Sequence, residues 1–277
     1  MSVGKRYRLR RLFHVPSGTT TIFAIDHGMT SPVLLDGLSD TRSRVAEAIR
    51  GGADVIMLSK GFARIVQDVF DRHTCWALLL SAQAAMATER QVVAVAEVEE
   101  ALRLGADAVV VFVALTGPHE PDMIRFVGAV GEACERLGMP FIAEAEYPTT
   151  YQPLSSLQDE YGADYLKRNS RLCAELGADI VKTNWTGDPR SFADLVVATS
   201  VPVVLAGGPR LSDGELLQRM EMAMEAGARG CSVGRNIFQH GHPEAITRAI
   251  AQVVRRQKSA AEALAELEGY LGEEQHG

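Results

Sequence analysis

A lysine stands where a buried strand is expected to end. In GADIVKTNWTGDP (residues 177–189), an apolar pair indicates a short buried strand, and Lys182 follows at once. Burial disfavours the charged form of an amine, and the neutral amine is a nucleophile that forms a Schiff base with a ketone. Two alternatives stay open. Lys182 can extend to the surface or pair with a carboxylate, and Lys60, which ends the run MLSKG, is a rival nucleophile.

A tyrosine and two glutamates close another apolar run, PFIAEAEY. Along a strand, Ala145 and Tyr147 share one face, while Glu144 and Glu146 share the other. If the small residues line the interior, Tyr147 points into the site and can carry a proton. The glutamates would then face the helices, an odd place for acids, so their orientation stays open.

The first apolar run, TTIFAID, ends in an acid and a histidine. Asp26 can hydrogen-bond a substrate hydroxyl or assist proton transfer, whereas His27 is as readily a packed core histidine. His240 and His242 form the motif HGH, but no third metal ligand accompanies them. We therefore expect neither a metal site nor a cofactor.

These groups follow strands that recur through the chain. GGADVIML, GADAVVVF, GADIVKT and GARGCSVG each pair a glycine able to end a helix with an apolar run. Runs rich in Val and Ile are typical of parallel strands covered on both faces. Amphipathic stretches such as DTRSRVAEAIRGG and GELLQRMEMAMEAG lie between them. Asp188 before Pro189, and Ser212 with Glu215, predict two helix starts.

Strands alternating with helices over 277 residues predict a single-domain (β/α)8 TIM barrel of the α/β class. An open doubly wound sheet is the alternative, but no G-x-G-x-x-G opens its first helix. Nine runs compete for eight strands, and CWALLLS and QVVAV stand so close that one must be irregular. We expect one domain over residues 1–277, with an N-terminal cap segment at 1–18 and a C-terminal helix and tail at 258–277.

Two glycine pairs follow the last two strand candidates. Gly207 and Gly208 lie in AGGPR, and Gly234 precedes Arg235 in SVGRN. In barrels of this kind the loops after strands seven and eight commonly bind phosphate through backbone N–H groups. An arginine there can fork onto phosphate oxygens. The alternative is that the glycines only make turns.

Composition narrows the classes of molecule that the protein is expected to bind. A formal charge of −7 argues against nucleic acid, and no apolar run approaches the roughly 18 residues that cross a membrane. The basic start, GKRYRLRRLF, predicts a surface helix. Four cysteines without a C-x-x-C pair indicate reduced, buried thiols and a cytoplasmic protein.

The motifs together resemble a known family. IDHGM, GGADVIMLSKG, EYP, GADIVKTNWTGDP, VPVVLAGGP and CSVGRNIF span nearly the whole chain in this order. They are similar to class I (Schiff-base) aldolases of the archaeal fructose-bisphosphate aldolase and 2-amino-3,7-dideoxy-heptulosonate synthase type. That group also includes a thiolase acting on a phosphorylated autoinducer.

The resemblance implies roles for particular residues. Lys182 would form the Schiff base, Tyr147 would be the general acid/base, and Asp26 an acid in the site. The substrate and its phosphate would be bound by a larger set: Gly207, Gly208, Gly234, Arg235, Lys60, His27 and Trp185. Because relatives form rings, a homo-oligomer is also implied.

The chain departs from its relatives around the tyrosine. YPTT replaces the usual YPRG at residues 147–150, and Ala145 stands where fructose-bisphosphate aldolases of this type tend to have an aromatic. The resemblance thus implies a donor end that is kept and an acceptor end that is altered, since a smaller Ala145 would admit a different aldehyde.

We therefore expect a lyase that joins a phosphorylated ketone, such as dihydroxyacetone phosphate, to an aldehyde, with aspartate semialdehyde as one acceptor. Three alternatives stay open. They are cleavage of fructose bisphosphate, acyl transfer from a phosphorylated diketone to coenzyme A, and a phosphate-sugar sensor that has lost the reaction.

Overall fold

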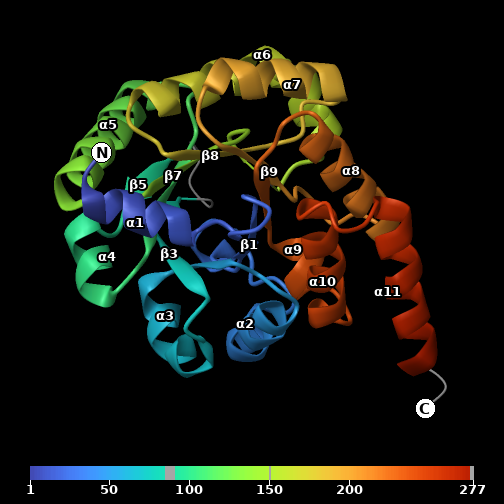
Figure 1. Cartoon of the computed structure of the whole chain (residues 1–277). Helices are drawn as coiled ribbons and strands as arrows, with labels where there is room; N and C mark the ends of the chain where they lie inside the picture. The colour runs from blue at the N-terminus through green and yellow to red at the C-terminus, as the bar shows by residue number, and fades with distance from the viewer. Residues whose placement is uncertain (85–90, 150, 275–277) are drawn as a thin grey trace.

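Eight parallel strands close into a barrel ringed by helices, as the computed structural model shows (Figure 1). The structure describes residues 1–84, 91–149 and 151–274; Thr150 of YPTT and residues 275–277 of the predicted tail lie outside them. Spatial order around the barrel is β1-β10-β9-β8-β7-β6-β3-β2. The predicted (β/α)8 barrel is confirmed. Its strands are β1 (Thr20–Ala24), β2 (Val55–Leu58), β3 (Cys75–Leu79), β6 (Ala108–Val113), β7 (Phe141–Ala145), β8 (Ile180–Thr183), β9 (Val203–Ala206) and β10 (Gly230–Val233).

The ninth strand candidate lies outside the barrel. β5 (Val92–Ala94), within QVVAV, pairs antiparallel with β4 (Ser81–Gln83), which begins just after β3 ends. The Gln83 side-chain amide donates to the Pro148 carbonyl at 2.9 Å. This short ribbon therefore contacts the segment that follows β7.

Helices cover the outside of the barrel. In chain order they are α1 (Val3–Arg11), α2 (Thr41–Arg50), α3 (Lys60–Val66), α4 (Val98–Leu104), α5 (Glu120–Leu137), α6 (Leu154–Glu175), α7 (Pro189–Thr199), α8 (Asp213–Glu225), α9 (Arg235–Phe238), α10 (Pro243–Val254) and α11 (Ala260–Glu274). None of those described is long and apolar enough to cross a membrane. All four cysteines are buried and free of disulfides.

Both predicted helix starts are confirmed. The Asp188 carboxylate accepts hydrogen bonds from the backbone N–H groups of Arg190 and Ser191 at the start of α7. Ser212 and Glu215 form a reciprocal capping box at the start of α8. Both caps satisfy N–H groups that the first helical turn leaves without partners.

Alternation along each strand divides the core in two. One cluster fills the barrel interior and includes Ile22, Met57, Val110, Ile142 and Ile180. The other cluster lies between the strands and the helices. Because side chains alternate with a period of two, the placement of Ile142 and Ile180 inside fixes which later residues of β7 and β8 face the interior.

The N-terminal segment closes one end of the barrel. Figure 1 shows α1 across the barrel, and Leu12 just after it packs with the interior cluster. The Lys5 ammonium of α1 lies 3.0 Å from an Asp179 carboxylate oxygen and 3.2 Å from one of Glu135. These ion pairs join α1 to the start of β8 and to α5, so the cap is held by charge as well as by apolar contact.

We expect Leu12→Ala to destabilise the protein by about 2–5 kcal/mol, since it leaves a cavity at a fully buried position. Chemical denaturation measures this change. Val15→Ala is the matched control, because Val15 lies three residues on and is 87% exposed. Equal, small effects of both changes would show that the segment does not close the barrel.

Candidate active site

A pocket opens at the carboxyl end of the strands, where barrel chemistry resides. It brings together most of the predicted site residues around about 40 Å³ of free space, and its lining residues come from six strand ends. Its lining residues are Ala24, Asp26, His27, Thr30, Phe112, Glu144, Glu146, Lys182, Ala206, Gly207, Gly208, Ser232, Gly234 and Arg235.

Lys182 lies inside this pocket, with 8% of its surface exposed. Its ammonium contacts a Glu144 carboxylate oxygen and lies 2.9 Å from one of Glu146. Glu144 and Lys182 are paired across neighbouring strands β7 and β8. Lys182, the last residue but one of β8, thus faces the interior, as the alternation from Ile180 requires.

The neutral resting amine expected for Lys182 is wrong. Burial does disfavour the ammonium, but the negative charges of Glu144 and Glu146 outweigh it and raise the pKa of Lys182. Lys182 therefore rests as an ammonium. It must pass a proton to a neighbour before its nitrogen can attack a carbonyl.

Tyr147 does not face the pocket, so the expected inward orientation is also wrong. Its ring is fully buried and stacks on Tyr165 of α6, with centroids 6.1 Å apart. Its hydroxyl has no hydrogen-bond partner among the described residues, and burial raises the pKa of Tyr147 to about 12. Ala145, on the same face, joins the helix-side core.

The glutamates occupy the interior face instead. With Ile142 inside the barrel, Glu144 and Glu146 follow on the same side and line the pocket. Burial raises the pKa of Glu144, although the nearby Lys182 opposes this shift. Acids are tolerated inside the barrel because the buried ammonium pairs with them.

Asp26 and His27 line the pocket beside this cluster. Burial first, and then the charge of Glu144, raise the pKa of Asp26 to about 8. Burial and the positive charges of Lys182 and Arg235 lower the pKa of His27 to about 3. At neutral pH, Asp26 can therefore hold a proton, and His27 is an uncharged imidazole.

Two glycines are required by close contacts. A Cβ atom on Gly234 would lie 2.2 Å from His27 Cε1 and 2.7 Å from the Ala24 carbonyl oxygen. On Gly207 it would lie 3.0 Å from Val233 Cγ1, whereas Gly208 has a positive φ of +69°. The backbone after β9 and β10 is thereby exposed to the pocket without side chains.

Arg235 begins α9 and lies largely buried at this end of the pocket. Its guanidinium carbon is 5.4 Å from the ring centroid of Tyr151, and its Nε–H has no partner among the described residues. Burial lowers the pKa of Arg235, within a range in which the guanidinium stays charged. The Tyr151 hydroxyl in turn hydrogen-bonds Thr30 at 3.0 Å.

Lys60 and Trp185, both expected in the site, lie elsewhere. The Lys60 ammonium donates to the Val95 carbonyl at 2.9 Å and to Glu100 at 3.1 Å. Trp185 stacks on Phe192 of α7, with ring centroids 5.2 Å apart. Neither residue lines the pocket.

Sequence reasoning missed Thr30, Phe112 and Ser232. Alternation gives a signal for Phe112, because Val110 faces the interior and Phe112 follows two residues later on β6.

His240 lies 3.3 Å from Asp213, and the described residues hold no group of three or more ligands suited to a metal ion.

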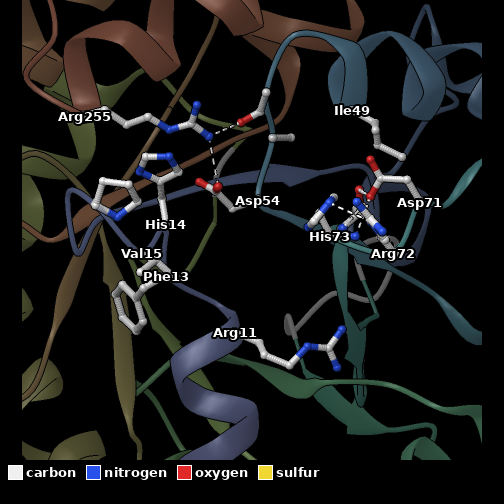
Figure 2. Close-up of a pocket in the computed structure, with 14 residues that line it drawn as sticks. Arg11, Phe13, His14, Val15, Ile49, Asp54, Asp71, Arg72, His73 and Arg255 are labelled. Atoms are coloured by element: carbon white, nitrogen blue, oxygen red, sulfur yellow. Dashed lines mark hydrogen bonds and ion pairs between the residues drawn. The ribbon is translucent and has the colours of Figure 1, made fainter.

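A larger hollow of about 470 Å³ lies at the other end of the barrel, beside the residues that precede β1, β2 and β3 (Figure 2). Arg255 there bonds to Asp54 at 2.9 Å and to the Gly52 carbonyl at 2.7 Å, and Arg11 pairs with Asp107. The described residues lining it include no lysine. The charged side chains at this hollow join helices to strand starts. The smaller pocket around Lys182 is therefore the better candidate for an active site.

Comparison with known proteins agrees with this geometry. The DeoC/LacD family aldolase model matches residues 20–240. The chain is 37% identical over 255 residues to the 2-amino-3,7-dideoxy-D-threo-hept-6-ulosonate synthase of Halobacterium salinarum, covering 91% of each chain. It is 32% identical, with the same coverage, to 2-amino-3,7-dideoxy-D-threo-hept-6-ulosonate synthase 1 of Archaeoglobus fulgidus.

Solved structures extend the comparison to the fold. An archaeal fructose 1,6-bisphosphate aldolase superposes with a TM-score of 0.78 at 26% identity, covering 91% of this chain and 99% of its own. A structure of such an aldolase has its catalytic lysine covalently bound to a carbinolamine intermediate. The chain therefore belongs to the DeoC/LacD family of aldolases, among the lysine-dependent, class I members.

The raised pKa of Asp26 predicts a pH dependence of stability. Its folded pKa of about 8 lies above the ordinary value of 3.8, so the stability linked to the protonated carboxyl is lost as pH rises through about 8. Asp26→Asn cannot ionise. We expect its melting temperature, relative to wild type, to increase from about pH 5 to about pH 9.

Thermal unfolding at a series of pH values measures this difference. Asp36→Asn is the control, because it removes the same charge from an exposed side chain. The same pH trend in both variants would contradict the assignment to a buried Asp26.

Proposed function

We propose that this protein is a class I aldolase that makes or breaks a C–C bond between a small phosphorylated ketone and an aldehyde, with Lys182 forming the Schiff base. One observation carries the proposal. A buried lysine faces a pocket at the carboxyl end of the barrel, in contact with carboxylates that can take its proton. Dihydroxyacetone phosphate is the donor that we propose.

The donor phosphate would lie at the loops after β9 and β10, the seventh and eighth strands of the barrel along the chain. Arg235 offers an unused Nε–H, and the glycines leave backbone exposed to the pocket. A guanidinium and backbone N–H groups suit phosphate oxygens. Binding there would place the ketone carbonyl toward Lys182 on β8, the neighbour of β9.

Glu144 would activate the lysine. The Lys182 ammonium gives a proton to the Glu144 carboxylate, and the freed amine adds to the ketone carbon. The resulting carbinolamine loses its hydroxyl as water when an acid returns a proton, which leaves a protonated imine. The raised pKa of Glu144 favours this exchange, since the carboxyl can hold the proton between steps.

The imine then draws electrons from the adjacent carbon. Glu144, a carboxylate again once it has returned its proton, takes a proton from that carbon and gives an enamine. The enamine attacks the aldehyde carbon, and the aldehyde oxygen takes up the proton that Glu144 holds. Water releases the product and restores the amine. Asp26, with a pKa of about 8, can hydrogen-bond a substrate hydroxyl as a neutral acid during these steps.

Two relatives at 32% identity or more bear the name of a heptulosonate synthase, so aspartate semialdehyde stays an acceptor candidate. A cytoplasmic location, a homo-oligomer and a single domain over residues 1–277 stay predictions. They come from the sequence and its resemblance to the family.

Trapping tests the Schiff base directly. Incubation with dihydroxyacetone phosphate followed by borohydride should add the mass of the reduced ketone, and peptide mass spectrometry should map it to Lys182. Lys182→Met and Lys182→Arg should both lose the adduct, since neither offers a primary amine at this position. Lys60→Met is the control and should keep it. An adduct that maps to Lys60, or no adduct at all, would contradict the proposal.

The geometry also separates two proton carriers. We expect Glu144→Gln to lower kcat by about a hundredfold or more, because the amide cannot take the lysine proton. Tyr147→Phe should keep kcat near the wild-type value, since its hydroxyl lies on the helix side. Steady-state kinetics with one donor and one aldehyde measures both. The opposite pattern, with Tyr147→Phe inactive and Glu144→Gln active, would overturn the role given to Glu144.

A further inference from the structure

The pocket is charged differently on its two sides. Around the barrel, β10 and β9 come first, then β8, β7 and β6. Arg235 and the glycines follow β10 and β9, and Lys182 lies on β8. The two glutamates come from β7 and the residue after it, and Phe112 lies on β6. A ketone with its phosphate beside Arg235 and its carbonyl at Lys182 must therefore meet its aldehyde on the side of β7 and β6. This step rests on the proposed function.

The aldehyde side is acidic. Glu146 follows Glu144 by two residues and lies just past the end of β7, which places its backbone about 6–7 Å farther toward the open end. Both glutamates are almost completely buried. No ion pair joins either glutamate to an arginine among the described residues. The Lys182 ammonium pairs with both, and the charge of Arg235 acts on Glu146 without a direct ion pair.

The cations of the pocket are already engaged. Among the described lining residues, Lys182 and Arg235 carry the positive charge, because the lowered pKa of His27 leaves its imidazole neutral. Lys182 becomes the imine, and Arg235 lies at the donor end. Lys60, expected as a further cation in the site, bonds to Glu100 and Val95 instead.

We infer that this aldolase takes an acceptor aldehyde without a phosphate group, either uncharged or ammonium-bearing, so that its aldol product carries one phosphate, at the donor end. A phosphate on the acceptor would bring a second anion into a desolvated region beside Glu146 and Glu144. Like charges placed together in this way disfavour binding. Hydroxyl or ammonium hydrogens, by contrast, are donors to carboxylate oxygens.

Two ketose phosphates that differ in one group test the inference. Fructose 1-phosphate and fructose 1,6-bisphosphate share the donor half, and they differ in the phosphate on the acceptor half. We expect kcat/KM for cleavage of the monophosphate to exceed that for the bisphosphate by about tenfold or more. Borohydride trapping of each compound on Lys182, over a series of concentrations, gives the same comparison without turnover.

Glu146→Gln tests the inference through the ratio of the two kcat/KM values, which a general loss of activity leaves unchanged. Removing this charge should raise the ratio of bisphosphate to monophosphate kcat/KM by about tenfold, even where both rates fall. The ratio from trapping should change in the same direction. Glu225→Gln, an exposed change outside the pocket, is the matched control and should leave both ratios unchanged.

The outcomes separate the two proposals. If dihydroxyacetone phosphate is trapped on Lys182 but the bisphosphate is trapped and cleaved as well as the monophosphate, the inference is overturned and the aldolase assignment stands. An unchanged ratio in Glu146→Gln would also overturn it. If none of these compounds forms an adduct on Lys182, the proposed function fails, and the inference fails with it.

Discussion

The site depends on one buried ion cluster, in which the Lys182 ammonium contacts Glu144 and Glu146 inside the barrel. A charge removed from water is costly unless it is paired, and here each sign makes the other tolerable. The pairing follows from the sheet, because Glu144 and Lys182 are partners across β7 and β8. In the proposed mechanism, the same contacts give the lysine a place to leave its proton and make the acceptor side acidic.

The two ends of the barrel have different roles: one end is closed by packing and ion pairs, and the other carries the pocket. At one end Leu12 packs on the interior cluster, and Arg255, Asp54 and Lys5 join helices to strand starts. This closure leaves the other end free to carry polar groups without exposing the core to water. The glycines after β9 and β10 then let backbone reach the pocket, which no side-chain-bearing residue could do at Gly234.

Local sequence signals predicted the architecture and part of the site. Glycine-plus-strand repeats and helix caps are local, so the barrel, the starts of α7 and α8, and the strand-end positions of Lys182 and Asp26 follow from them. Tyr147, Lys60 and Trp185 do not, because their orientation depends on distant partners. Tyr147 packs on Tyr165, Lys60 bonds to Glu100, and small alanines on β7 suggested the wrong inner face.

Tyr147 lies in an environment other than the one that the resemblance to the family implied. The tyrosine keeps its place in the motif, yet its ring lies among helix-side aromatics while two acids take the interior face. Four residues on, Tyr151 stacks on Arg235 and bonds to Thr30, so the segment after β7 contacts the donor end as well. One short stretch of chain therefore supplies the proposed proton acceptor, the charge on the proposed acceptor side and the surroundings of the proposed phosphate site. Changes there can alter the substrate while the barrel and its lysine stay the same.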